Sequence, residues 1–327
     1  MAADQQPEVN LDLSRALASA MADQTAKQKA EIRGRLGREA AGKDCEDCGK
    51  KLSSSADTKA TKSEIAVGDI RYYYELHGRG KPVVFIAGYG ANHTAWREIY
   101  PRFTDRFRVL IFDNPASGRT RDGGGELSAE ALAAGTAGLI RKLGLGRADI
   151  VGHSMGGTIA QVLAADYPEL VDRLVIVNSA GRWSRRMLMA QCGLLRALKR
   201  GISLDCQLEL AMPWLFGRAA LNDRNRAEAL RRRLLDNPYP PTIGEMERQY
   251  PVLAGFDAAA FLPRISAPTL IVISDDDILA LPEESEELAA GITGAKITRL
   301  DGGHVSEYEE PEKLAEAIRR FLADPEG

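Results

Sequence analysis

Short apolar runs alternate with amphipathic stretches over most of the chain after about residue 64. The apolar runs are short, continuous and rich in β-branched residues, which is typical of buried strands. They lie at 70–76, 83–87, 109–114, 149–153, 174–178, 270–274 and 297–300. Helical spacing of apolar residues predicts helices over 128–143, before Gly144, and over 311–322. The alternation predicts an α/β fold around a mostly parallel sheet.

Two intervals depart from this alternation. Between residues 182 and 261 apolar residues recur at helical spacings and no strand pattern remains, which predicts an inserted helical segment. Residues 1–63 are polar with some helical spacing, and 53–61 has the composition of a flexible linker. We therefore expect a helical extension at 1–63, a core at 64–181 and 262–327, and an inserted helical region at 182–261.

Composition narrows the classes of function. The chain has 327 residues, 44% of them hydrophobic, which suffices for one large α/β core with an appendage. A net charge of −3 gives no electrostatic reason to expect a nucleic-acid partner. No apolar run is long enough to span a membrane, and the first residues lack the pattern of a signal peptide. We expect a cytoplasmic protein with a small-molecule substrate.

The strongest chemical signal is the sequence Gly152-His153-Ser154-Met155-Gly156. It follows an apolar run and precedes a helical segment, which is the context of a G-x-S-x-G nucleophile elbow. The serine of such an elbow projects from a strained turn at the end of a strand. Larger residues at either glycine would collide with the neighbouring strand and helix. The motif therefore predicts Ser154 as a nucleophile.

A nucleophilic serine needs a base and a carboxylate that orients the base. The chain has four histidines, and His304 is favoured because it follows the last apolar strand on a glycine loop. The carboxylate is expected between serine and histidine in the chain. Asp275, Asp276 and Asp277 directly follow the buried run at 270–274, and position alone does not choose among them.

An oxyanion hole would complete the site. The main-chain N–H of Met155, the residue after the nucleophile, supplies one donor, and the second comes from the loop after an earlier strand. The run at 83–87 and the turn Gly88-Tyr89-Gly90 form such a loop. The N–H of Tyr89 is therefore the second candidate donor.

These motifs, in this order, resemble those of the α/β-hydrolase superfamily, and in particular of its lid-bearing serine hydrolases, over roughly residues 65–322. The loop 113–120 resembles the family's Asp-x-Arg-Gly-x-Gly-x-Ser segment, 274–277 its acid loop and 302–304 its histidine loop. The resemblance implies an eight-stranded type of sheet and a lid after the sixth strand. It also implies Asp277 as the acid and His304 as the base. Some members carry the acid one strand earlier, where this chain has Asn178.

The chain also departs from the family pattern. Ala87 stands where the family often has histidine, and Pro115 and Ala116 replace Arg-Gly. These departures bear on the shape of the oxyanion loop. In the expected lid, Trp214, Leu215 and Phe216 are candidates for lining a substrate pocket, although they equally suit packing between lid helices.

The extension contains Cys45-Glu46-Asp47-Cys48-Gly49. Residues 31–52 resemble the first half of the zinc finger of DksA/TraR-type regulators of RNA polymerase. A second cysteine pair is absent, and two thiolates do not complete a structural zinc site. We expect no bound metal there, with binding assisted by another chain or a redox pair as alternatives. Contact of the extension with another chain is a further expectation.

Together these features predict a serine hydrolase that cleaves an ester or lactone of a small to medium organic acid, with no cofactor. Hydrolysis of a carbon–carbon bond in a diketone-like ring-cleavage product is an alternative for the same triad. A ligand-sensing or scaffolding protein that keeps the fold without turnover is an alternative of another class.

Overall fold

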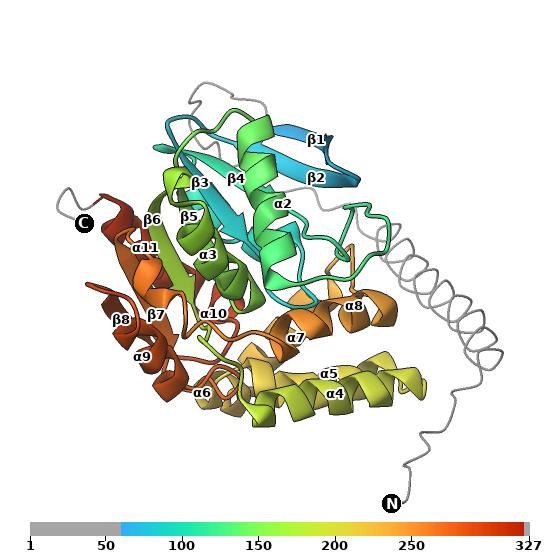
Figure 1. Cartoon of the computed structure of the whole chain (residues 1–327). Coiled ribbons are helices and arrows are strands. Elements are labelled where there is room, and N and C mark those ends of the chain that lie inside the picture. Colours follow the sequence, from blue (N-terminus) through green and yellow to red (C-terminus); the bar gives the residue numbers. More distant parts are fainter. Residues whose placement is uncertain (1–59, 324–327) are drawn as a thin grey trace, which may run out of the picture. The chain divides into compact units, whose positions relative to one another are not determined.

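The computed structural model describes residues 60–323, and these form an α/β structure around a single sheet (Figure 1). The sheet has eight strands in the order β1-β2-β4-β3-β5-β6-β7-β8. β1 pairs with β2 and β2 with β4 in antiparallel fashion, while every later pair is parallel. The predicted mostly parallel α/β sheet is confirmed. The strands are β1 (Thr61–Val67), β2 (Ile70–His77), β3 (Lys81–Ile86), β4 (Phe107–Phe112), β5 (Ala148–His153), β6 (Val171–Val177), β7 (Thr269–Ser274) and β8 (Lys296–Leu300).

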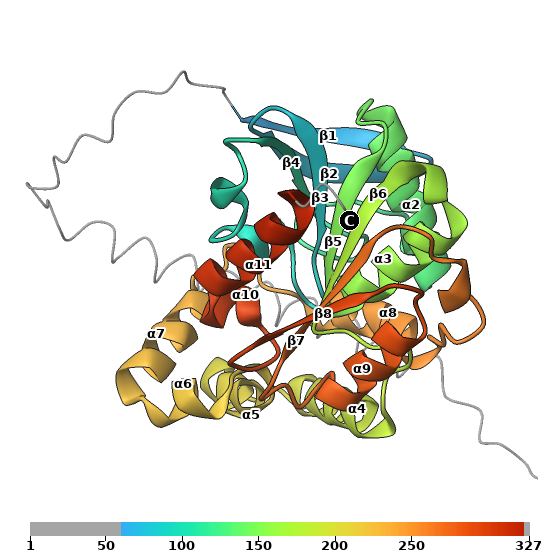
Figure 2. The same cartoon turned by 90° about the vertical axis from the view of Figure 1, so that its left-hand side faces the viewer.

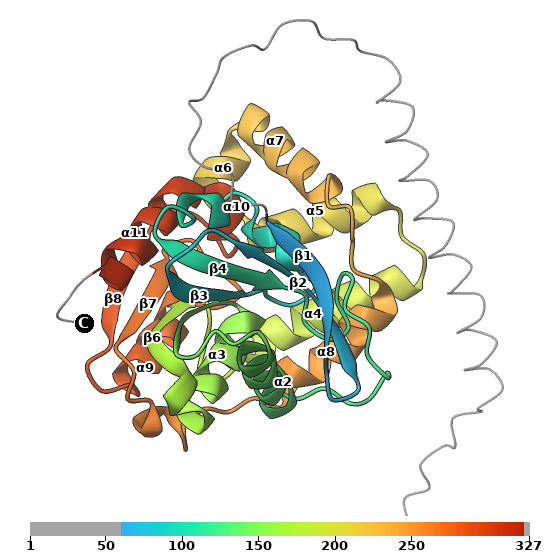
Figure 3. The ribbon, with the colours of Figure 1, turned by 90° about the horizontal axis from the view of Figure 1, so that it is seen from above.

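Helices cover both faces of the sheet (Figure 2). Along the central strands, alternate side chains point to opposite faces, so β3 contributes Val84 and Ile86 to one apolar cluster and Val83 and Phe85 to the other. The first face carries α2 (Ala129–Lys142), α3 (Met155–Asp166) and α9 (Pro282–Ala290). The second carries α11 (Pro311–Ala323) and the short 3-10 turns η1 (His93–Trp96) and η2 (Tyr100–Arg102). Figure 3 shows α11 separated from α2 and α3 by the sheet.

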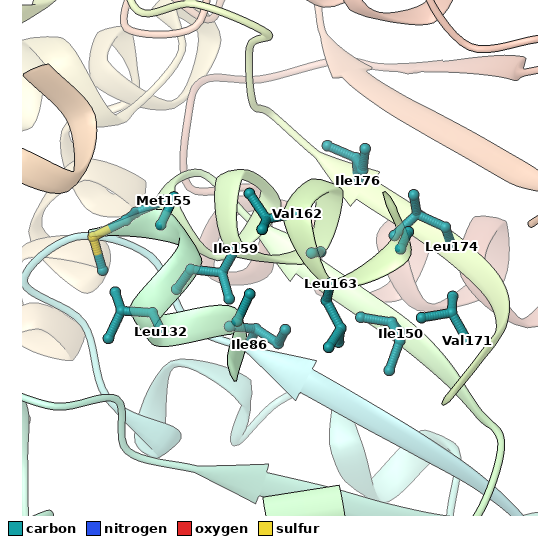
Figure 4. Packing of buried hydrophobic residues seen from close by; sticks show 14 of the residues in the cluster. Ile86, Leu132, Ile150, Met155, Ile159, Val162, Leu163, Val171, Leu174 and Ile176 are labelled. Atoms are coloured by element: carbon teal, nitrogen blue, oxygen red, sulfur yellow. The ribbon is translucent and has the colours of Figure 1, made fainter. Parts of the chain in front are cut away.

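Helix α3 is the central buried helix. Every residue from Met155 to Ala165 is buried. Its apolar side chains, including Ile159 and Leu163, lie against Ile86 and Ile150 of the two neighbouring strands (Figure 4). Burial on this scale fixes the start of the helix, and therefore the turn that precedes it, relative to the sheet.

The segment between β6 and β7 is helical, as the spacing predicted. It contains α4 (Arg185–Lys199), α5 (Leu204–Leu215), α6 (Arg218–Asn222), α7 (Arg224–Leu235) and α8 (Ile243–Ala254). The 3-10 turn η4 (Leu262–Arg264) leads back to β7, and η3 (Pro168–Leu170) precedes β6. In Figures 1 and 2 these helices gather beyond one end of the sheet strands, the end at which β5 passes into α3.

Most predicted element boundaries agree with the structure to within three residues. Helix 128–143 is α2, with Ser128 as its N-cap and Leu143 as its C-cap. The strand β1 was not predicted, and the linker predicted at 53–61 was wrong at its last residue, because Thr61 begins β1. The reason is physical: β1 is an edge strand, its first three residues are exposed, and its sequence lacks the apolar run of a buried strand. Residues 62 and 63, also assigned to the extension, belong to β1, and residues 1–59, including Cys45 and Cys48, lie outside the described residues.

Candidate active site

Ser154 lies on a tight turn between β5 and α3. Its φ of 55° and ψ of −120° are far from the values of either element, which identifies a strained turn. Its main-chain N–H donates to the carbonyl of Val177 at 2.9 Å, and its own carbonyl accepts from Ser179 Oγ at 2.9 Å. Both contacts tie the turn to the end of β6. The structure thus has the strand, turn and helix that the motif predicted.

The two glycines of the motif leave no room for a side chain. A Cβ on Gly152 would lie 2.3 Å from the carbonyl oxygen of Gly156, and a Cβ on Gly156 would lie 2.1 Å from that of Ile86. Both contacts are with main-chain atoms, which cannot move aside cheaply. The close approach of α3 to β5 and β3 therefore requires glycine at both positions, as expected from the sequence.

His304 and Asp277 form a hydrogen-bonded chain with Ser154. His304 Nε2 lies 2.8 Å from Ser154 Oγ, and His304 Nδ1 lies 2.8 Å from Asp277 Oδ2. Asp277 follows β7 and His304 follows β8, so both reach Ser154 at the carboxyl end of the parallel strands. All three side chains are buried. A carboxylate, an imidazole and a hydroxyl in this order can relay a proton from the hydroxyl to the ring.

The structure distinguishes the three consecutive aspartates. Asp277 Oδ1 accepts from the main-chain N–H groups of Leu279 and Ala280 at 2.8 and 3.0 Å, which leaves Oδ2 for His304. Asp275 is exposed and forms an ion pair with Arg299. Asp276 binds Arg218 at 2.8 Å. Only Asp277 among the three contacts His304 in the described chain.

The electrostatic surroundings favour the charged form of His304. Burial by itself lowers the pKa of His304, but the neighbouring Asp277, by its charge and its hydrogen bond, raises that pKa above the ordinary value of 6.5. When it is ionised, Glu307 acts in the same direction. A raised pKa means that the ring holds a proton more readily than a free imidazole, which is what a base that accepts the proton of Ser154 requires.

The other histidines have different partners. His93 Nδ1 lies 2.7 Å from Asp113 Oδ1, and His77 Nε2 lies 2.9 Å from Glu75 Oε2. His153 directly precedes Ser154, yet its ring Nε2 lies 2.8 Å from the carbonyl oxygen of His304. This contact was not predicted, because it joins residues 151 positions apart.

The predicted oxyanion loop lies beside Ser154. A Cβ on Gly88 would be 3.1 Å from Ser154 Cβ, so the loop passes close to the nucleophile. Tyr89 follows Gly88, and its hydroxyl donates to the carbonyl of Met246 on α8 at 3.0 Å. Met155 is buried as the first residue of α3. The two proposed donor residues therefore flank the serine.

A residue that the sequence analysis missed holds this loop. Gln249 of α8 is fully buried, and its Oε1 accepts from the Gly90 N–H at 2.8 Å. Its Nε2 donates to the Ala116 carbonyl at 3.0 Å. Ala116 has a φ of 56°, in the left-handed region, at the position where the family motif has glycine. Gln249 thus connects the oxyanion loop and the loop that departs from the family pattern.

Two of the three predicted pocket residues, Leu215 and Phe216, lie next to the histidine loop. The Val305 N–H donates to the carbonyl of Leu215 at 3.2 Å. Phe216 is buried in an apolar cluster, whose other buried members are Met212, Ala220, Leu230 and Val305. Trp214 and Leu215 are only partly buried and pack against the main core. Phe216 packs in this cluster, and contact of Trp214, Leu215 or Phe216 with a substrate stays a prediction.

No group of three or more histidine, cysteine, aspartate or glutamate side chains suited to a metal ion occurs within residues 60–323. Cys192 and Cys206 are free thiols. In the same part of the chain, no helix is both long and apolar enough to cross a bilayer.

The sheet topology, the helices on both faces and the serine turn after β5 together define an α/β hydrolase. The chain belongs to this family, because residues 81–311 match its model, described as alpha/beta hydrolase fold. The chain is accordingly an enzyme of the α/β-hydrolase class.

Individual relatives cover most of the chain. A protein of Stutzerimonas stutzeri (strain A1501), named "Putative carbamate hydrolase RutD", is 29% identical over 266 residues, covering 78% of this chain and 98% of the relative. A thermophilic esterase from Thermogutta terrifontis is similar in structure, with a TM-score of 0.69 and 26% identity over 81% of this chain and 98% of that one. The enol-lactonase from Burkholderia xenovorans LB400 has a TM-score of 0.71 at 22% identity, over 80% of this chain and 100% of that one, which shows a shared fold.

Proposed function

We propose that this protein is a serine hydrolase that cleaves a carboxylic ester or lactone of a small to medium organic acid. The observation that carries the proposal is the hydrogen-bonded chain Ser154–His304–Asp277, with 2.8 Å between each pair of heavy atoms. The fold and the names of the relatives would not be enough, because α/β hydrolases catalyse several reactions on one scaffold.

In the proposed mechanism, His304 Nε2 takes the proton of the Ser154 hydroxyl as the oxygen attacks the substrate carbonyl. Asp277 holds the Nδ1–H of His304 and stabilises the ring when it becomes a cation. The Met155 and Tyr89 N–H groups donate to the oxyanion of the tetrahedral intermediate. His304 then gives its proton to the leaving alcohol, and water, with His304 as base again, releases the acid and regenerates Ser154.

The helices α4 to α8 are proposed to act as a lid over this site. They lie between β6 and β7 in the chain, and their contacts reach both sides of Ser154: Gln249 and Met246 bind the oxyanion loop, and Leu215 binds the histidine loop. A cover that excludes water would favour the acyl transfer steps and would shape the acyl pocket. Trp214, Leu215 and Phe216 are the proposed pocket residues.

The relatives suggest which substrates to test first. Two structural neighbours are an esterase and an enol-lactonase, and a sequence relative is named "Putative carbamate hydrolase RutD". An ester, a lactone and a carbamate share a carbonyl with an oxygen leaving group, so one triad can attack each. A dienone ring-cleavage product tests the carbon–carbon alternative. Negligible turnover of all of them, with saturable binding, would favour a sensing or scaffolding protein.

The decisive experiment is hydrolysis of p-nitrophenyl esters of increasing acyl length by the wild type and by Ser154→Ala. We expect turnover that peaks at one length and falls by about 10⁴-fold or more in the variant. Equal turnover by the two proteins would refute the assignment of Ser154. Circular dichroism of both proteins shows whether the variant keeps its fold.

A cytoplasmic location and contact of residues 1–63 with another chain are also part of the proposal. A pull-down that compares the full chain with a chain that begins at residue 60 tests the second point. The zinc-finger resemblance of residues 31–52 is tested by metal analysis of the purified full chain and of Cys45→Ser.

A further inference from the structure

The main chain of His304 is held by two buried donors. Its carbonyl oxygen accepts from Asn178 Nδ2 at 2.7 Å and from His153 Nε2 at 2.8 Å. The three residues are each 4% exposed or less. A carbonyl has two lone pairs, so both of its acceptor positions are filled. The ends of β5 and β6 therefore fix the backbone that carries the proposed base.

The contact with a carbonyl determines the tautomer of His153. A carbonyl oxygen can only accept, so His153 Nε2 must carry the proton. Burial, together with the nearby His304, lowers the pKa of His153 to about 3, so the ring is neutral. Its Nδ1 then has a lone pair and no hydrogen. That Nδ1 lies 3.2 Å from Glu307 Oε1.

Two lone pairs repel each other at this distance, so the contact is favourable only when Glu307 carries a proton. The side chain of Glu307 is 2% exposed, and its Oε2 has no hydrogen-bond partner among the described residues. No lysine or arginine of residues 60–323 forms an ion pair with it. A carboxylate without cationic partners in a dry site is unfavourable, whereas a carboxylic acid is tolerated.

The ionisable groups that face Glu307 are few. His153 is in contact with Glu307, and His304 and Asp277 act on Glu307 through their charges. The hydroxyl of Tyr308, the next residue in the chain, interacts with Glu307 and with the charges of Arg97 and Arg233. Burial raises the pKa of Glu307 to about 8; the charge of His304 lowers it and that of Asp277 raises it. The short contact with His153, the burial and the electrostatics therefore indicate the same neutral acid at pH 7.

We propose that Glu307 is a positioning residue that acts as a neutral carboxylic acid. Its O–H donates to His153 Nδ1, which keeps the His153 proton on Nε2 and directs it at the carbonyl of His304. Glu307 thereby sets the position of His304 relative to Ser154 without touching the substrate. The inference rests on the proposed function, because it takes His304 as the catalytic base.

Loss of this proton would release one of the two donors. When Glu307 gives its proton to the solvent, the carboxylate can only accept, and the His153 proton moves from Nε2 to Nδ1 to bind it. Nε2 then presents a lone pair to the carbonyl of His304, and the two repel. The kcat of the wild type should therefore fall as the pH rises above about 8.

Glu307→Gln tests this step directly. The amide N–H can donate to His153 Nδ1 as the acid does, and it cannot ionise. We expect kcat within about threefold of the wild type at pH 7 and no fall up to about pH 10. Glu307→Leu has no donor, and we expect its kcat to fall by about tenfold at pH 7 with little change in KM. Glu312→Gln, at an exposed position of α11, is the matched control and should keep the wild-type profile.

A merely structural Glu307 would give the wild type and Glu307→Gln the same pH profile, and that result would overturn the proposal. A second measurement does not depend on activity. Infrared titration of the full chain from about pH 6 to about pH 10 should show the C=O band of a buried carboxylic acid that disappears near pH 8. The band should be absent in Glu307→Gln and present in Glu312→Gln. Absence of the band in the wild type overturns the inference, whereas a band without ester turnover counts against the proposed function alone.

Discussion

The side-chain amide of Gln249 joins two loops that are far apart in the sequence: it accepts from the Gly90 N–H at 2.8 Å and donates to the Ala116 carbonyl at 3.0 Å. Gln249 belongs to α8, so a helix of the inserted segment holds the proposed oxyanion loop in place. The inserted segment and the main sheet are thus coupled at the position where a second oxyanion donor is expected.

Gln249→Leu should weaken both the fold and the turnover. The change leaves the Gly90 N–H and the Ala116 carbonyl without their partner in a buried place, which costs about 1–3 kcal/mol in the free energy of unfolding. We expect kcat to fall more than KM rises, because the loop no longer presents Tyr89 in a fixed position. Urea unfolding and steady-state kinetics measure the two effects. Glu247→Gln, two residues earlier on α8 and partly exposed, is the control. Equal losses in both variants would show that Gln249 has no special role.

Asp277→Asn should lower kcat by about 10⁴-fold, because an amide no longer stabilises the imidazolium form of His304. The pH profile gives a sharper test. The active form of His304 is neutral, so kcat/KM rises as the pH passes its pKa, which Asp277 raises above 6.5. Removing the charge should shift the midpoint of residual activity to lower pH. An unshifted midpoint would show that Asp277 does not act on His304.

The two motif glycines should tolerate no side chain. Gly156→Ala places a methyl group 2.1 Å from the Ile86 carbonyl, so α3 must move away from the sheet, and we expect little folded protein or a large loss of stability. Gly193→Ala is the matched change, because a Cβ there meets nothing within 4 Å and the site is inside α4. It should raise the free energy of unfolding by about 1 kcal/mol. Thermal unfolding of the two variants side by side measures both effects. A Gly156→Ala protein as stable as Gly193→Ala would contradict the steric argument.

Phe216→Ala and Trp214→Ala should have different consequences. Phe216 is buried among residues of α5 to α7 and Val305, so its truncation should cost about 3–5 kcal/mol of stability. Trp214 is only partly buried, so its truncation should mainly change the preferred acyl length of a p-nitrophenyl ester. Denaturation midpoints and the ester series measure these effects. If Trp214→Ala leaves the length preference unchanged, Trp214 does not line the pocket.

Glu75 should contribute stability that is lost in acid. Burial alone would raise the pKa of Glu75, but hydrogen bonds from His77, Tyr73 and Lys62 outweigh burial and lower the pKa to about 2 from 4.5. The unfolded chain therefore binds the proton more tightly, and the stabilisation is present above about pH 4.5 and disappears towards pH 2. Glu75→Gln should be less stable at pH 7 by about 1–3 kcal/mol and should approach the wild type in acid. A constant difference at all pH values would exclude this linkage.

The sequence was sufficient for features that local patterns encode. Buried strands such as β7 are continuous apolar runs, and the elbow around Ser154 is a contiguous motif with a steric requirement. The edge strand β1 escaped prediction because half-exposed alternation is a weak signal. The choice of Asp277 among three aspartates came from family resemblance, since the turn that gives its Oδ1 two N–H donors is not visible in the sequence.

Contacts between distant segments could not be predicted from the sequence for a further reason. The contacts of Gln249 with Gly90 and Ala116, and of His153 with His304 and Glu307, join residues more than a hundred positions apart in the sequence. In the sequence, Gln249 looks like any glutamine of a surface helix, and Glu307 looks like any glutamate of a surface loop. Only burial and the shortage of partners make these side chains informative.

The separation of the three triad residues along the chain has a consequence during synthesis. Ser154 follows β5, whereas Asp277 and His304 follow β7 and β8, and His304 lies 150 residues after Ser154. A ribosome makes the amino-terminal part first. Until β8 has emerged and joined the edge of the sheet, the nascent chain carries the Ser154 hydroxyl without its proposed base, so the proposed hydrolase activity cannot begin before that strand is in place.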